Sequence, residues 1–75
     1  MPGTNMRTVI LHDATYTLKT GRSTTLERRY PCGSTMEIKI PSSDVPYLET
    51  CSEAYISAYF VMYLIEEAKK HEKKN

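Results

Sequence analysis

Four short segments within residues 1–40 have the hydrophobic patterning of β-strands. They cover residues 8–11, 15–20, 24–30 and 35–40. In the last of them, three apolar residues alternate with Glu37 and Lys39, which is the period of two expected of a strand with one covered face. The first is a β-branched apolar run, which is typical of a strand that is central or covered on both faces.

Turn-forming residues separate these segments. The gaps contain His12-Asp13-Ala14, Gly21-Arg22-Ser23 and Pro31-Cys32-Gly33-Ser34. Connections this short cannot carry the chain across a sheet to a parallel neighbour, so consecutive strands should pair antiparallel. The sequence therefore predicts a three- or four-stranded antiparallel β-meander over residues 7–40.

The segment at residues 24–30 alternates imperfectly. Arg28 falls on the same face as Leu26 and Tyr30, where an apolar residue would be expected. Either Arg28 lies near a sheet edge and extends its guanidinium to solvent, or a β-bulge changes the facing of the strand.

A long helix is predicted over residues 51–71, because neither Pro nor Gly interrupts this stretch. Thr50 and Glu53 match a capping box, in which the two side chains accept hydrogen bonds from the first free amides of a helix. The preceding residues 42–46 end in Pro46 and are expected to form a loop or a single helical turn.

Together these elements predict an α+β fold in which the β-meander packs on one long C-terminal helix. A chain of 75 residues has room for one such domain, residues 1–75, and its core is thin for its surface. Residues 1–5 lack periodicity and are expected to form a flexible arm, and residues 72–75 a frayed tail.

The predicted helix is apolar on all sides between residues 54 and 65. A helix that lies on a sheet needs an apolar stripe of only about 100°. One row, at alternating spacings of four and three, suits close packing: Ala54, Ala58, Val61, Ile65 and Ala68. Two further rows carry larger side chains: Ile56, Phe60 and Tyr63, and Tyr55, Tyr59 and Met62. One sheet can cover one or two of these rows, so part of the helix should remain available.

A second copy of the chain is the favoured occupant of this surface, because self-association would supply burial that so small a core lacks. It would pack on Ala54, Ala58, Val61 and Ile65. A different protein is the second candidate, with aromatic and Met side chains as anchors: Tyr55, Tyr59, Phe60, Met62 and Tyr63. A monomer whose strands and arm wrap the helix is a third. Membrane contact is not expected, because the apolar stretch is much shorter than a bilayer core.

Neither composition nor motifs indicate an enzyme. The chain has ten Lys and Arg against nine Asp and Glu, so bulk charge does not define a partner. Its glycines are isolated, which excludes a phosphate-binding loop, and His12 and Asp13 should point to opposite faces of a strand rather than form a dyad. We therefore predict no catalytic residues and no cofactor.

The two cysteines, Cys32 and Cys51, are expected to be free thiols, with a disulfide between them as the alternative. Small secreted domains usually carry more cysteines, and the N-terminus lacks the pattern of a secretory signal peptide. Neither His12 nor His71 is spaced for metal ligation with a Cys, so no metal site is predicted. These features favour a cytoplasmic protein.

Basic residues on the predicted sheet suggest nucleic-acid binding as an alternative function. They fall on its outward face or in an adjoining turn: Lys19, Arg22, Arg29 and Lys39. Such a face could contact phosphates. Glu27 and Glu37 interrupt it, and no aromatic residue is expected there for base stacking.

The stretch Met36-Glu37-Ile38-Lys39-Ile40, followed by Ser52-Glu53 and a helix, resembles the ribbon-helix-helix family of DNA-binding proteins. The resemblance covers residues 36–65 and implies that strand side chains read the major groove. The segment between this strand and the helix is short for the family's first helix and contains Pro46.

The sequence favours a non-enzymatic binding protein, because catalytic chemistry is missing while interaction surface is in excess. We expect a homodimeric regulator, adaptor or inhibitor that docks on another protein. A DNA-binding transcriptional regulator is the alternative. Capture of a small polar ligand at a subunit interface is a third class, which no motif supports.

Overall fold

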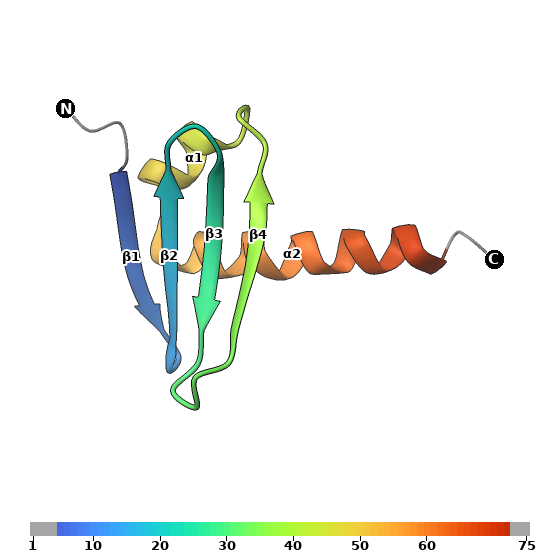
Figure 1. The fold of residues 1–75 in the computed structure, drawn as a ribbon, viewed down its shortest axis with the longest axis horizontal. Coiled ribbons are helices and arrows are strands. Elements are labelled where there is room, and N and C mark those ends of the chain that lie inside the picture. Colours follow the sequence, from blue (N-terminus) through green and yellow to red (C-terminus); the bar gives the residue numbers. More distant parts are fainter. Residues whose placement is uncertain (1–4, 73–75) are drawn as a thin grey trace.

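The computed structural model describes the backbone of residues 5–72 and the side chains of residues 6–70. Most of the predicted arm (1–4) and tail (73–75) therefore lie outside the described residues. Four antiparallel strands form one sheet: β1 (Asn5–Leu11), β2 (Ala14–Thr20), β3 (Thr24–Arg29) and β4 (Thr35–Ile40). Their spatial order is β1-β2-β3-β4, so each strand pairs with its neighbour in sequence (Figure 1).

This sheet confirms the predicted α+β class and the antiparallel meander, with four strands. β4, the strand that carries the ribbon-helix-helix resemblance, pairs along its length with β3 of the same chain, in a register that includes Leu26 opposite Ile38. The expectation that residues 8–11 form a central or doubly covered strand is wrong. β1 is an edge strand, and Ile10 is exposed on the outer face of the sheet.

A two-residue turn joins β1 to β2. His12 and Asp13 have φ values of 51° and 67°, both in the left-handed region. Two successive left-handed residues are the signature of a type I′ turn, whose twist matches that of the flanking strands. Because the turn is this tight, Ala14 is already paired with Leu11 and opens β2 rather than belonging to the turn.

Two helices follow the sheet, α1 (Val45–Thr50) and α2 (Glu53–Glu72). The predicted capping box is wrong, because Thr50 is the last residue of α1 and donates its hydroxyl to the Pro46 carbonyl at 3.3 Å. Cys51 is extended and separates the helices. Ser52 instead precedes α2, and its Oγ accepts a hydrogen bond from the Tyr55 amide at 3.2 Å. A hydroxyl bonded to the third residue of the helix is the expected N-cap geometry.

The core lies between the inner face of the sheet and the two helices. Its buried side chains are Val9, Ala14, Tyr16, Leu18, Leu26, Ile38, Ile40, Leu48, Ile56 and Phe60. Only Ile56 and Phe60 come from α2, and they are one helical turn apart on one face. Leu48 is the contribution of α1.

Helix α2 crosses the sheet transversely and continues beyond β4 (Figure 1). It has 20 residues, so it is about 30 Å long. The outer strands of a four-stranded sheet are only about 15 Å apart. The sheet is therefore too narrow to cover the whole helix. Within residues 5–72, neither helix has the length and apolarity needed to cross a membrane.

Candidate interaction surface

Phe60 is the residue that anchors α2 to the sheet. Its side chain is 0% exposed, the Tyr16 ring packs against it edge-on at 6.0 Å between centroids, and the Arg28 guanidinium carbon lies 4.5 Å from its ring centre. The sequence placed Phe60 among the partner-binding anchors. The structure places it in the core, out of reach of any partner.

Two tyrosine hydroxyls fix the rotation of α2 about its axis. The Tyr16 hydroxyl shares a hydrogen bond with Ser57 Oγ at 3.1 Å, and the Tyr59 hydroxyl donates to Asp44 Oδ2 at 2.6 Å. Burial, followed by this hydrogen bond to Asp44, raises the pKa of Tyr59. Because the hydroxyl is held by Asp44, Tyr59 offers its ring edge rather than its polar tip to a partner.

A groove of about 230 Å³ runs along the flank of α2 that carries Tyr59. Its lining is Tyr59, Met62, Tyr63, Glu66, Glu67 and Lys70. Met62 is 58% exposed, and Tyr55, one turn before Tyr59, is 48% exposed. Their rings lie 6.5 Å apart between centroids. Apart from Phe60, the predicted partner-binding residues therefore share one accessible flank of the helix.

The predicted self-association row faces a different direction. Ala54, Ala58, Val61 and Ile65 are all exposed, the last two at 43% and 45%. Consecutive helix residues are about 100° apart, so Ala58 points about 100° away from Tyr59. The two predicted surfaces of α2 are therefore distinct, and neither is the face that meets the sheet.

Arg7 organises the junction between the two helices, a role that the sequence did not reveal. Its Nη1 donates to the Leu48 carbonyl at 2.8 Å and its Nη2 to the Cys51 carbonyl at 2.6 Å. These carbonyls belong to the end of α1, where the helix lacks internal donors. The planar guanidinium can bond both at once, which ties β1 to the start of α2.

Arg28 lies on the inner face of the sheet, between two aromatic rings. Its guanidinium carbon is 5.0 Å from the Tyr30 ring centre as well as 4.5 Å from that of Phe60. A guanidinium in contact with aromatic rings is attracted electrostatically to them. Its Nε is buried and has no hydrogen-bond partner among the described residues. Arg28 therefore neither marks a bulge nor sits on the basic outer face, and Met36 lies opposite it on β4.

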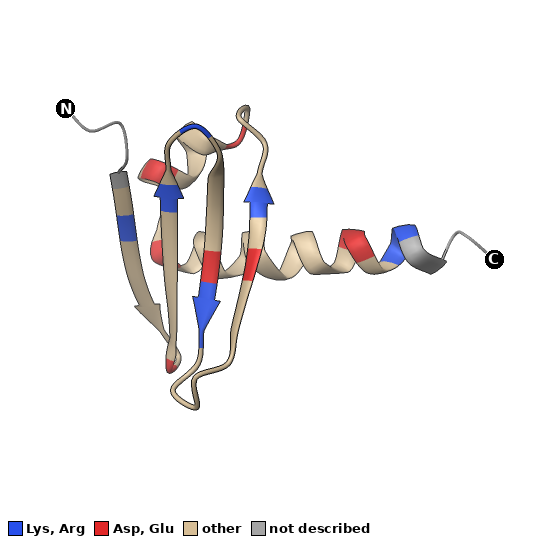
Figure 2. Cartoon of the chain, viewed as in Figure 1, with Lys and Arg blue, Asp and Glu red and all other residues tan. Residues whose placement is uncertain are grey.

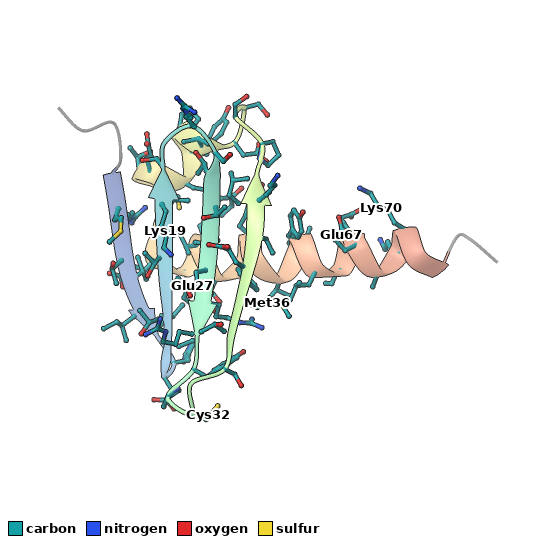
Figure 3. All side chains as sticks on the ribbon, viewed as in Figure 1. Lys19, Glu27, Cys32, Met36, Glu67 and Lys70 are labelled. Atoms are coloured by element: carbon teal, nitrogen blue, oxygen red, sulfur yellow. The ribbon has the colours of Figure 1, made fainter. Side chains whose placement is uncertain are left out.

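Acidic side chains occupy the middle of the outer sheet face, between the basic ones (Figure 2). Lys19 Nζ lies 3.6 Å from a Glu27 oxygen and 4.0 Å from a Glu37 oxygen. Lys19 and Glu27 come from the neighbouring strands β2 and β3 and are labelled in Figure 3. Arg29 lies 3.9 Å from the other Glu27 oxygen. Arg22 is in the β2–β3 turn and Lys39 is exposed on β4. Two of the four predicted phosphate contacts are thus neutralised by neighbouring carboxylates.

Both cysteines are free. Cys32 is exposed in the β3–β4 turn, and a hydrogen bond to Ser34 lowers the pKa of its thiol. Cys51 Sγ is half-buried and lies 3.6 Å from the Leu48 carbonyl oxygen. Within the described part of the chain, no three His, Cys, Asp or Glu side chains gather to hold a metal ion.

Comparison with models of protein families, with curated proteins and with solved structures finds no match to this chain. Its function must therefore be argued from the surfaces described above.

Proposed function

We propose that this chain is a non-enzymatic, homodimeric binding protein of the cytoplasm, a regulator, adaptor or inhibitor that docks on another protein. The observation that carries this proposal is the surface of α2. Apart from the face that carries Ile56 and Phe60, the helix exposes apolar side chains on its other sides. A small domain with so much uncovered apolar surface is expected to use it for association.

The two exposed rows support two kinds of contact. Small and β-branched residues in the row of Ala54, Ala58, Val61 and Ile65 suit a second copy of the chain, because they allow helices to approach closely. The tyrosine flank suits a different protein, because Tyr and Met are enriched at interface cores. Both contacts can form together because the rows point about 100° apart.

The groove beside Tyr59 also suggests the chemistry of that partner. Its lining combines the side chains of Met62 and Tyr63 with the carboxylates of Glu66 and Glu67. Glu67 is paired with Lys70 at 3.7 Å, whereas Glu66 has no ion pair with the side chains of residues 6–70. A partner segment that inserts an apolar side chain and places a basic group beside it would match this groove.

DNA binding, the alternative, is supported less well. The ion pairs of Lys19 and Arg29 with Glu27 occupy the charges that would have to release phosphate counterions. The outer face also lacks aromatic side chains for base stacking within the described strands.

Affinity capture from a native cell extract tests the docking proposal when wild type is compared with Met62→Glu. We expect the variant to lose a captured protein, because it places a charge in the lining of the groove. Tyr47→Glu is the matched control, since Tyr47 is also an exposed large side chain, at 68% against 58% for Met62, but lies on α1. Capture of DNA that resists moderate salt, or equal loss with both variants, would contradict the proposal.

A further inference from the structure

The free edge of β4 is a second uncovered feature beside the projecting part of α2. Tyr30 donates its amide to the Ser34 carbonyl at 2.9 Å, and their strands continue in register through Arg28 opposite Met36. Hydrogen-bonded pairs alternate with non-bonded pairs in antiparallel strands. The even-numbered residues of β4 therefore bond to β3, and the amides and carbonyls of Thr35, Glu37 and Lys39 point to the open edge.

The inner face of the sheet is incompletely covered at the end where β4 begins. Met36 is 45% exposed and Tyr30 is 40% exposed, although both point to the same side as the core residues. In the view of Figure 3, the labelled Met36 lies on the side of α2 toward the turn that contains Cys32. This apolar patch is thus open beside the helix and directly under the free strand edge.

One flank of α2 faces the same space. Tyr59 is held by Asp44, which follows the far end of β4, so the opposite flank faces the end where Met36 lies. Val61, Leu64 and Ala68 lie about 140–180° from Tyr59 around the helix. Val61 and Ala68 are exposed, and Leu64 is half-buried. An apolar helix flank, an apolar sheet patch and an open strand edge therefore meet at one place.

We propose that two copies of this chain pair antiparallel through their β4 edges into one eight-stranded sheet, with the projecting parts of the two α2 helices side by side beneath it. The proposal rests on the self-association proposed above, but it places the contact on the β4 edge and the flank of Val61 and Leu64 instead of on the row that contains Ala58. A two-fold axis beside Met36 would bring each projecting helix under the partner's exposed Met36 and Tyr30. Because the contact is isologous, it covers the same three features in both copies: the helix flank, the apolar sheet patch and the open strand edge.

Steric and hydrogen-bonding requirements select the register. Packed helices need axes about 8–10 Å apart, so the two-fold axis must lie to one side of α2 rather than on it. If Met36 lies opposite Met36 of the second copy, the two-fold axis passes beside α2. Glu37 is then opposite Thr35 of the second copy. The same combination already occurs within the chain, where the Thr25 hydroxyl donates to Glu37 Oε2 at 3.1 Å. Thr35 and Glu37 are also residues whose backbone groups face the edge.

Charges are complementary in this arrangement as well. Glu67 follows Phe60 by seven residues, which is about two turns, so it lies on the sheet-facing side of the helix beyond the sheet of its own chain. In the dimer that side faces the second sheet. Arg28 there has a buried Nε without a hydrogen-bond partner among the described residues. Each copy would thus bring the carboxylate of Glu67, which pairs with Lys70 in the single chain, toward the other's Arg28.

Light scattering of wild type, Glu37→Pro and Glu37→Ala tests the pairing. Proline removes an amide that points to the open edge and is tolerated at such positions, so the sheet of each copy should be retained. Alanine removes the same side-chain contacts but keeps the amide. We expect dimers for wild type and Glu37→Ala and a monomer of unchanged circular dichroism for Glu37→Pro. Ala58→Glu tests the rival contact through the row that contains Ala58; because that row faces away from both sheets in the proposed dimer, this variant should remain dimeric.

The alternative outcomes are distinct. A dimeric Glu37→Pro together with a monomeric Ala58→Glu would replace the β4 pairing by back-to-back helices and overturn this inference alone. A monomeric wild type would overturn the proposed self-association itself, and with it this geometry.

Disulfide trapping keeps the test decisive if Glu37→Pro does not fold. In a Cys32→Ser background, Met36→Cys should form a covalent dimer on mild oxidation, because non-bonded antiparallel neighbours have Cα atoms about 4.5 Å apart. Lys39→Cys in the same background should not, since residue 39 of the two copies would lie about 20 Å apart along the strands. Equal trapping of both variants, or of neither, would overturn the proposed register and pairing.

Discussion

Both the part of α2 under the sheet and the part that projects beyond β4 carry large apolar side chains, but only the first part buries them. In the half under the sheet, Ile56 and Phe60 are 1% and 0% exposed. In the half that projects beyond β4, Met62 and Ile65 remain 58% and 45% exposed. The difference arises from the width of the sheet, since four strands cannot cover a helix of 20 residues. Burial in this protein is thus decided by what lies opposite the helix rather than by the helix sequence.

Among the variants that test this difference between the two parts of α2, Phe60→Ala should lower the free energy of unfolding most. It removes a fully buried ring that contacts both Tyr16 and Arg28, and such truncations cost about 3–5 kcal/mol of unfolding free energy. Chemical denaturation at a low protein concentration, where the chain is monomeric, measures this loss of unfolding free energy. Ile65→Ala is the matched control in the projecting half and should change stability by less than about 0.5 kcal/mol. Similar losses for both variants would show that the projecting half is covered within the monomer.

Arg7→Ala should cause the second-largest loss of stability. It leaves the Leu48 and Cys51 carbonyls, just before the covered part of α2, without their donors. Hydrogen bonds from charged donors contribute about 1.5–3 kcal/mol. Thermal unfolding should show a clear fall in Tm. Arg7→Lys should recover only part of it, since one ammonium group cannot reproduce the planar pair of donors. Full recovery by Lys would mean that charge, not bidentate geometry, matters here.

Tyr59 directly precedes Phe60 in α2, and its contribution to the stability of the fold depends on pH. The pKa of Tyr59 is raised in the folded protein, so the folded state holds this proton more tightly than the unfolded state. Its stabilisation is complete below the unfolded tyrosine pKa of about 10 and is lost as pH rises above that value. Denaturation from pH 8 to 11 should show the decline in wild type and a weaker one in Tyr59→Phe. An identical decline in both would assign it to other groups.

Lys70→Ala should have the smallest effect. Lys70 and Glu67 form an exposed pair at 3.7 Å, three residues apart in the projecting half. Exposed pairs contribute about 0–1 kcal/mol, and Ala has a high helix propensity that offsets the loss. The change in unfolding free energy should therefore stay within about 0.5 kcal/mol. A larger loss would mean that the projecting half makes contacts beyond those described.

Local patterns were sufficient to predict most of the fold. Alternation placed Ile38 and Ile40 inward, and short turns implied an antiparallel meander, both of which depend only on neighbouring residues. The helix start was missed because Thr50 and Ser52 are both good caps, each with an acidic or polar residue nearby. The choice between them depends on where α1 ends, which tertiary contacts decide.

The functional surfaces were predictable only in part. The sequence showed that α2 has more apolar rows than one sheet can cover, but the identity of the covered row depends on Tyr16 and Asp44, which are far away in the chain. Phe60 was therefore grouped with the accessible aromatics. Arg7 was missed for the same reason, since its partners Leu48 and Cys51 are 41 and 44 residues distant.

The nearest-neighbour order of the strands has a consequence for how the chain folds. Each of the three hairpins closes a short loop, so the sheet can assemble stepwise with little loss of chain entropy. The Arg7 contacts close a loop of more than half the chain and can form only after α1 is in place. Refolding should therefore begin in the hairpins and finish when the first strand is fastened to the junction of the two helices.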